Sequence, residues 1–164
     1  MNKITRAALT LGCICLITAC SKSNKTTCSN AEALNYQQSG DCVYAKDKIL
    51  PHGGYLVKVT KYTLQPQQVG DSFEVNVSNS PCIGGPGDAY TFLQLVTLGG
   101  AFQPNSFCVG LNGFDFNITD SMNIQWSGAP VTGQGHFDNQ GASFSFSGIV
   151  HSSDGDSVIE LRSY

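Results

Sequence analysis

The sequence predicts an all-β domain, and two observations carry that prediction. From Gly54 onward, apolar residues alternate with polar ones in short runs, which is the period of a strand with one buried face. Clusters of Gly, Asn and Asp separate these runs, as expected of the tight turns that join antiparallel strands. No stretch after Val43 shows the period of a helix.

The predicted strands follow one another along the chain. Five of them alternate clearly: Tyr55-Val57-Val59, Phe73-Val75-Val77, Phe114-Phe116-Ile118, Met122-Ile124-Trp126 and Phe144-Phe146. Residues 90–98 are apolar on both faces and predict a central strand. Residues 107–111 and 158–161 complete the set, and residues 131–137 form a weaker, Gly-rich strand. The predicted turns lie at residues 84–87, 99–100, 112–113, 138–141 and 154–155.

Eight or nine short strands joined by short turns indicate a single antiparallel meander. The prediction favours a barrel that is lipocalin-like in shape, with a β-sandwich as the alternative. Residues 124–161, which include the phrase V-T-G-Q-G-H-F-D-N-Q-G, resemble the closing hairpins of small β-meander envelope lipoproteins of unknown function. That resemblance implies an envelope protein and no particular activity.

The first nineteen residues predict an export signal. Lys3 and Arg6 precede an apolar run over residues 7–19. This run is shorter than the roughly 20 residues that span a bilayer core. The run ends in Leu16-Ile17-Thr18-Ala19-Cys20, which resembles the lipobox of bacterial lipoproteins. This resemblance implies cleavage before Cys20 and a diacylglycerol on its thiol, with acyl chains such as palmitate anchoring the protein. By resemblance to lipoprotein sorting rules, Ser21 favours the outer membrane, on either its periplasmic side or the cell surface.

The remaining cysteines predict two disulfides. Cys13 and Cys15 lie in the expected signal peptide, which leaves Cys28, Cys42, Cys82 and Cys108 for an oxidising compartment. Proximity in the sequence favours the pairs Cys28–Cys42 and Cys82–Cys108, and the competing zinc site lacks a C-x-x-C spacing. The expected organisation is a signal peptide (1–19), a lipidated tether (20–27), a Cys-bounded unit (28–44) and a β-domain (45–164).

The Cys-bounded unit resembles a short repeat found in secreted and surface proteins of some Gram-negative bacteria. The matching residues are Ala33, Asn35, Tyr36, Gly40, Asp41, Cys42 and Tyr44. The resemblance implies a small disulfide-stapled structural unit between the tether and the β-domain.

Charge is distributed unevenly, although the net charge is only −3. Six Lys between Lys22 and Lys61 accompany three acidic residues, whereas nine acidic residues and a single basic one, Arg162, follow Lys61. An acidic β-domain does not suit nucleic acid, because phosphate binding needs Lys and Arg. The basic N-terminal part could lie against anionic lipid headgroups, and a solvated tether is the alternative.

No motif predicts a catalytic centre, a metal site or a cofactor. There is no G-x-S-x-G, and the Ser residues of 143–147 alternate with Phe, as on the outward face of a strand. His52, His136 and His151 lack ligand spacing, and the last two could meet across a hairpin only if its register allows. Asp154-Gly155-Asp156 predicts a hairpin turn rather than a calcium site. The candidates for a ligand rim are Phe102, Trp126 and His136.

The sequence therefore predicts a lipid-anchored envelope protein that is a non-catalytic binding module for a small ligand, a glycan or a protein. A structural or interaction subunit of an outer-membrane complex is the alternative. A hydrolase whose site is assembled from residues distant in sequence is less favoured than either, because no catalytic motif is present.

Overall fold

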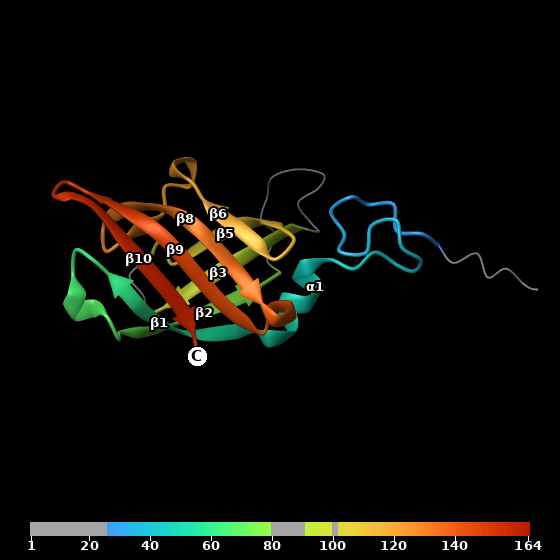
Figure 1. Ribbon diagram of the computed structural model, residues 1–164, viewed down its shortest axis with the longest axis horizontal. Coiled ribbons are helices and arrows are strands. Elements are labelled where there is room, and N and C mark those ends of the chain that lie inside the picture. The colour runs from blue at the N-terminus through green and yellow to red at the C-terminus, as the bar shows by residue number, and fades with distance from the viewer. Residues whose placement is uncertain (1–25, 80–90, 100–101) are drawn as a thin grey trace, which may run out of the picture.

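A computed structural model describes residues 26–79, 91–99 and 102–164 of the chain. The expected signal peptide, Cys20, Cys82 and the predicted turn at residues 84–87 lie outside the described residues. The described part consists of the Cys-bounded unit followed by an antiparallel barrel (Figure 1).

The described residues form ten strands and several short helical turns. The strands are β1 (Gly54–Tyr62), β2 (Ser72–Ser78), β3 (Phe92–Leu98), β4 (Phe102–Gln103), β5 (Ser106–Asn112), β6 (Asp115–Ile118), β7 (Gln125–Trp126), β8 (Ala129–Asp138), β9 (Ser143–Ser152) and β10 (Gly155–Ser163). The α-helix α1 is Ala45–Ile49, and the 3-10 helices are η1 (Leu50–His52), η2 (Pro66–Gln68), η3 (Asp120–Met122) and η4 (Asn139–Gly141). Within the described residues, no helix has the length and apolar character needed to cross a membrane.

Eight of these strands close into an up-and-down barrel. Going round it, the order is β1, β2, β3, β5, β6, β8, β9 and β10, and each neighbouring pair is antiparallel. The pairing of β10 with β1 closes the sheet, with Val57 opposite Ser163 and Tyr62 opposite Ile159. The predicted antiparallel meander and its lipocalin-like barrel shape are confirmed, and the sandwich alternative is wrong.

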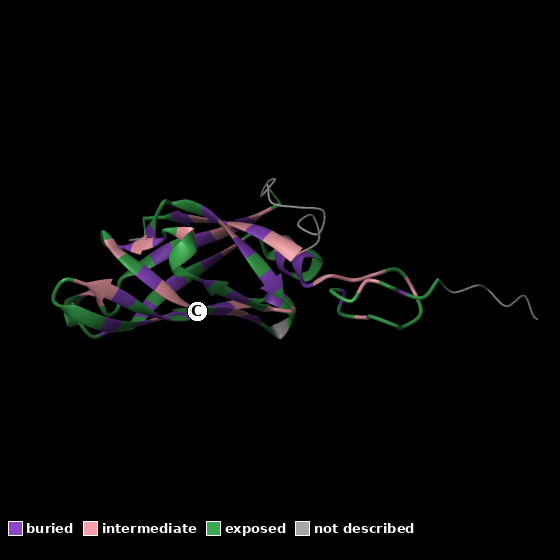
Figure 2. Cartoon of the chain, turned by 90° about the horizontal axis from the view of Figure 1, so that it is seen from above, coloured by how far each residue is buried: buried purple, intermediate pink, exposed green. Residues whose placement is uncertain are grey.

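The alternating residues identified in the sequence fill the inside of the barrel. Tyr55, Val57 and Val59 of β1 are buried, whereas Leu56 and Lys58 between them are exposed. Buried and exposed positions alternate along the barrel strands in this way (Figure 2). The same alternation runs through β2, β3, β5, β9 and β10. Antiparallel strands expose alternate side chains on opposite faces, so one face supplies the core and the other faces water.

The Gly-rich strand predicted as weak is β8, which runs for ten residues and pairs with both β6 and β9. Its glycines face the inside of the barrel and leave space for aromatic rings. A Cβ atom on Gly135 would collide with the ring of Phe116, and one on Gly133 would lie 2.7 Å from the ring of Phe146. The glycines therefore do not destabilise β8 in the sheet. The Phe rings of the neighbouring strands fill the space that larger side chains on β8 would occupy.

The α1 helix closes one end of the barrel, where the sequence predicted no helix. Its residue Ile49 is completely buried and packs against Gly141, at the tip of the hairpin between β8 and β9. The Tyr55 hydroxyl donates a hydrogen bond to the Gly141 carbonyl, and burial raises the pKa of Tyr55 to about 12. The helix could not be predicted from the sequence, because five residues are too few to show a 3.6-residue period.

The strands β4 and β7 close the other end of the barrel. They form a short ribbon beside β8, in which Phe102 lies opposite Trp126 with ring centroids 4.9 Å apart. The predicted strand Met122-Ile124-Trp126 is only partly correct, because Met122 lies in η3 and β7 is limited to two residues. Both rings are 2% exposed and belong to the hydrophobic core.

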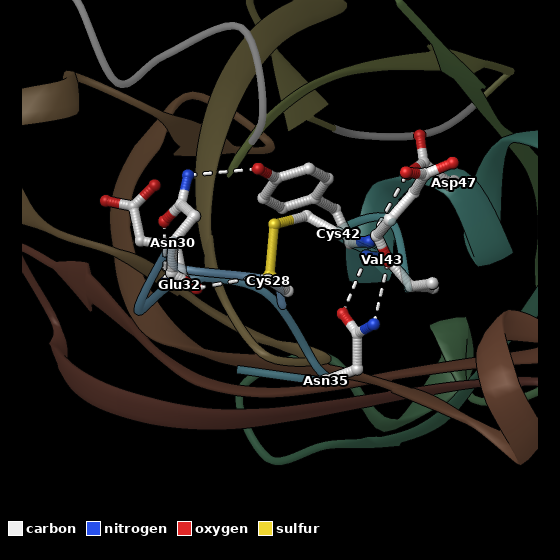
Figure 3. Close-up of a disulfide and its surroundings, with 9 residues drawn as sticks. Cys28, Asn30, Glu32, Asn35, Cys42, Val43 and Asp47 are labelled. Carbon is white, nitrogen blue, oxygen red and sulfur yellow. Dashed lines mark hydrogen bonds between the residues drawn. A yellow bond between two sulfur atoms is a disulfide. The ribbon is translucent and has the colours of Figure 1, made fainter. Parts of the chain in front are cut away.

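The Cys-bounded unit lies beyond α1, outside the barrel (Figure 1). Its predicted disulfide between Cys28 and Cys42 is confirmed, with the two Cα atoms 4.9 Å apart (Figure 3). The Asn35 side chain acts as an additional cross-link, since its amide donates to the Asp41 carbonyl and its oxygen accepts from the Val43 N–H, both at 2.8 Å. These contacts explain why a unit with little regular secondary structure has one defined conformation.

Candidate functional site

A polar groove of about 400 Å³ runs across the outside of strands β6, β8, β9 and β10. Two cross-strand rows of outward-facing residues build it. The first row is Asp115, His136, Ser145 and Arg162, and the second is Gln134, Ser147 and Glu160. The small Ser side chains of β9 lie between longer ones on β8 and β10, so the surface is hollowed along β9. We call the surface formed by these two rows the outer groove.

The outer groove contains an ionic cluster centred on His136. Its Nδ1 atom is 2.6 Å from the Asp115 carboxylate, and its Nε2 atom is 2.9 Å from the Asp138 carboxylate. The hydrogen bond with Asp115 is the main cause that raises the pKa of His136. Burial opposes it, and the hydrogen bond with Asp138 and the charges of both carboxylates add to the rise. Both ring nitrogens can donate only in the imidazolium form, so the geometry favours a protonated histidine.

The cluster differs from the relay of a serine hydrolase. Ser145 is directly opposite His136 on the neighbouring strand, and its hydroxyl lies 3.5 Å from the His136 main-chain carbonyl. A general base must offer a free ring nitrogen to the hydroxyl that it deprotonates. Carboxylates occupy both nitrogens of His136, so in this arrangement the ring has no lone pair for Ser145.

His136 and His151 do not meet across the β8–β9 hairpin. His136 faces Ser145, whereas His151 lies towards the other end of β9 and contacts Asp156 at 2.9 Å and Thr132 at 3.0 Å. His52 is separate from both, in η1. In the described part of the chain, no three His, Cys, Asp or Glu residues form a group that could hold a metal ion.

The segment Asp154-Gly155-Asp156 forms the predicted hairpin turn between β9 and β10. Gly155 has a φ of +117°, which glycine adopts without strain, and it pairs with Ser152 across the turn. The Asp156 carboxylate accepts a hydrogen bond from the His151 ring at 2.9 Å.

The structure separates the three residues proposed as a ligand rim. His136 lies in the outer groove, whereas Phe102 and Trp126 are buried together at one end of the barrel. A smaller hollow of about 100 Å³ lies beside Trp126, lined also by Gln68, Asp71 and Phe73. The indole N–H of Trp126 is buried and has no hydrogen-bond partner among the described residues.

The second predicted disulfide involves a residue that the structure does not describe. Cys108 is disulfide-bonded. Its expected partner, Cys82, lies outside the described residues, so the pair Cys82–Cys108 stays a prediction. Lipidation of Cys20 stays a prediction for the same reason.

Most of the groove residues were not identified from the sequence. Ser145 and Ser147 were recognised as outward-facing, but Asp115, Gln134, Glu160 and Arg162 carried no motif. These residues come together only because the strands pair in one particular register. The one available signal was Arg162, since it is the only Lys or Arg after Lys61.

Compared with known proteins, the chain matches no family model, no curated protein and no solved structure.

Proposed function

We propose that this chain is a lipid-anchored protein of the bacterial cell envelope, and that its barrel is a non-catalytic module that binds a glycan in the outer groove. The outer groove itself carries the proposal. Its lining offers hydroxyl, amide, carboxylate, imidazole and guanidinium groups from four strands within one hollow. Glycans present many hydroxyl groups, so a surface that mixes donors and acceptors at close spacing is suited to them.

The inside of the barrel is less suited to a ligand. Most inward positions of the described strands carry packed aliphatic and aromatic side chains, with one aromatic cluster around Phe137 and another around Trp126. A ligand inside would have to displace these side chains at a cost in packing. This observation favours the outside over the interior as the binding surface.

The anchor is supported by the lipobox at residues 16–20 and by the short apolar run before it. A protein with two or more acyl chains on Cys20 would remain in the membrane. Mass spectrometry of the protein extracted from bacterial envelopes should find an N-terminus at Cys20 that carries acyl chains. A mature N-terminus elsewhere, or an unmodified Cys20 thiol, would contradict this part of the proposal.

Binding should be tested on the mature protein in detergent by calorimetric titration against a panel of oligosaccharides. We expect at least one glycan to bind wild type and to lose affinity for Ser145→Tyr and Ser147→Tyr, which fill the hollow. Ser106→Tyr is the matched control, because Ser106 is exposed on β5 outside the outer groove. A ligand at a hundred times its dissociation constant should also stabilise the fold by about 2.7 kcal/mol.

The alternative function, an interaction subunit of an outer-membrane complex, has one observation in its favour. Leu56 and Leu98 are 49% and 52% exposed, on either side of Glu74 across β1, β2 and β3. Exposed aliphatic side chains of this kind are found in protein contacts. If no glycan binds and Leu56→Ser abolishes co-purification of a specific envelope protein, this alternative replaces the glycan proposal.

A further inference from the structure

Two cations stand directly opposite each other at the edge of the outer groove. Arg162 of β10 lines the groove, and Lys58 of β1 is its cross-strand partner where the barrel closes. Both side chains are exposed on the outer face. Among the described residues, neither forms an ion pair, since the described ion pairs involve other cations.

This arrangement is unfavourable for the protein alone. Like charges directly opposite each other on neighbouring strands repel and destabilise a sheet. Three carboxylates on the groove side of Arg162 already have partners: Glu160 binds Lys61 at 3.3 Å, and Asp115 and Asp138 bind His136. Two unpaired cations are thus placed together in a protein whose net charge is −3.

The cations are also placed where a ligand in the outer groove would meet them. The cross-strand row runs from His136 through Ser145 and Arg162 to Lys58, so the Ser145 hydroxyl separates the His136 cluster from the two cations. An Arg guanidinium binds carboxylate or phosphate oxygens in pairs, and a neighbouring Lys adds a positive charge. The junction of β1 and β10 therefore offers an anion site that is continuous with the polar hollow.

We propose that the ligand of the outer groove is an acidic glycan, whose carboxylate or phosphate group binds Arg162 and Lys58 while its hydroxyl groups lie along Ser145 and Ser147. This inference deepens the proposed function and rests on it. The two sources of the anion are a uronic acid and a phosphorylated sugar. Both would satisfy the same guanidinium, so the experiment must include each of them.

The test is a calorimetric titration of the mature protein with a uronic acid oligosaccharide, a phosphorylated oligosaccharide and a neutral oligosaccharide of the same length. We expect one of the acidic ligands to bind more tightly than the neutral one, and its affinity to fall as salt is added. Arg162→Gln and Lys58→Gln should each weaken it, the first by about tenfold or more because charge-assisted hydrogen bonds are lost. Lys48→Gln on α1, an exposed lysine away from the outer groove, makes the same charge change and should leave affinity unchanged.

Thermal unfolding of the same variants separates loss of binding from loss of fold. Because each substitution removes one of two repelling cations, Arg162→Gln and Lys58→Gln should be at least as stable as wild type. Equal affinity for acidic and neutral ligands, or unchanged binding by both variants, would overturn the anion site. In that case, if a neutral glycan binds wild type and Ser145→Tyr abolishes this binding, the proposed function is still supported. Failure of every oligosaccharide to bind would contradict both proposals.

Discussion

At the scale of single residues, the inside of the barrel depends on positions where a side chain is missing. Gly133, Gly135 and Gly148 lie side by side on β8 and β9, with Gly133 opposite Gly148. The rings of Phe116 and Phe146 lie over these glycines, and any Cβ there would meet a ring or the neighbouring backbone. The two strands can therefore support large aromatic residues at neighbouring positions without separating.

Gly135→Ala should destabilise the barrel more than a methyl group usually does. The new Cβ would overlap the ring of Phe116, which is 2% exposed and has little room to move. Overpacking of this kind costs about 1–3 kcal/mol, and the degree of overlap places Gly135 at or above the upper end of that range. Urea unfolding followed by circular dichroism measures the loss. Phe116→Leu should restore part of it in the double variant, and additive losses would contradict the overlap.

The His136 cluster should make stability depend on pH. The folded pKa of His136 is raised, so the cluster stabilises the fold fully below the unfolded pKa of about 6.5 and loses that effect as pH rises through the folded pKa. Asp115→Asn should lower the His136 pKa, measured by NMR titration of the ring, and Asp138→Asn should lower it less. The stability difference between wild type and Asp115→Asn should be larger at pH ~5.5 than above the folded pKa. An unchanged His136 pKa in Asp115→Asn would contradict this account.

Alternation within the long strands predicted which side chains are buried, whereas isolated aromatic residues and side-chain partners were predicted poorly. Phe102 and Trp126 were proposed as a rim because aromatic residues often line pockets, yet the same apolar area makes them core residues here. The carboxylate partners of His136 could not be recognised, because Asp115 lies 21 residues away and Asp138, two residues on, carries no motif. Such contacts depend on strand register, which cannot be read from the composition of one strand.

At the scale of elements, the two ends of the barrel are closed by segments that had little or no sequence signal. The α1 helix and the β4–β7 ribbon are each short, but they bring Ile49, Phe102 and Trp126 into the core. Elements of two to five residues fall below the window in which periodicity can be recognised. The longer strands were predicted because burial on one face fixes their alternation.

Ile49→Ala tests whether α1 is part of the barrel rather than a linker. Ile49 is completely buried against the β8–β9 hairpin tip, so its truncation should cost about 2–5 kcal/mol. Lys48→Ala, on the exposed side of the same helix, is the control and should change stability by less than about 0.5 kcal/mol. Thermal or urea unfolding gives both values. Equal effects of the two substitutions would show that α1 does not contribute to the core.

The bulge in β1 shows a limit of pattern-based prediction at the level of a strand. Lys61 rather than Thr60 lies opposite Glu160, so the register shifts between Val59 and Lys61. The next inward side chain after Val59 is then Tyr62, three positions later. A bulge of this kind changes the phase of the alternation, and it also places Lys61 next to Glu160 on the outer face.

At the scale of the whole molecule, the sequence predicted an all-β antiparallel meander but left a β-sandwich open as an alternative to the barrel. The long strands and their meander order followed from alternation and turns, although eight or nine strands were predicted and ten are present in the described part of the chain. The choice between barrel and sandwich depended on whether β10 meets β1. That contact joins residues about a hundred positions apart, such as Lys58 and Arg162. The outer groove could not be predicted for the same reason, because closure and register assemble it from four strands.

The Cys-bounded unit and the barrel should respond separately to loss of the disulfide. The described hydrogen bonds of Asn30 and Asn35 join residues within 28–44 to one another. Cys28→Ser/Cys42→Ser should therefore increase amide hydrogen exchange in the unit while the unfolding temperature of the barrel changes little. Hydrogen exchange followed by mass spectrometry measures both regions at once. A large drop in barrel stability would show that the unit supports the barrel.

The up-and-down course of the chain decides which turn and which chain terminus lie at each end of the barrel. The first barrel strand starts beside α1, and the last one ends at the same pole, where the Tyr164 N–H donates to the Leu56 carbonyl. The turn between β9 and β10 lies at the opposite pole, farthest from the Cys-bounded unit (Figure 1). A fusion at the C-terminus would therefore extend from the end of the barrel where β1 begins. An epitope inserted at Asp154–Gly155 would instead extend from the opposite end, away from the Cys-bounded unit.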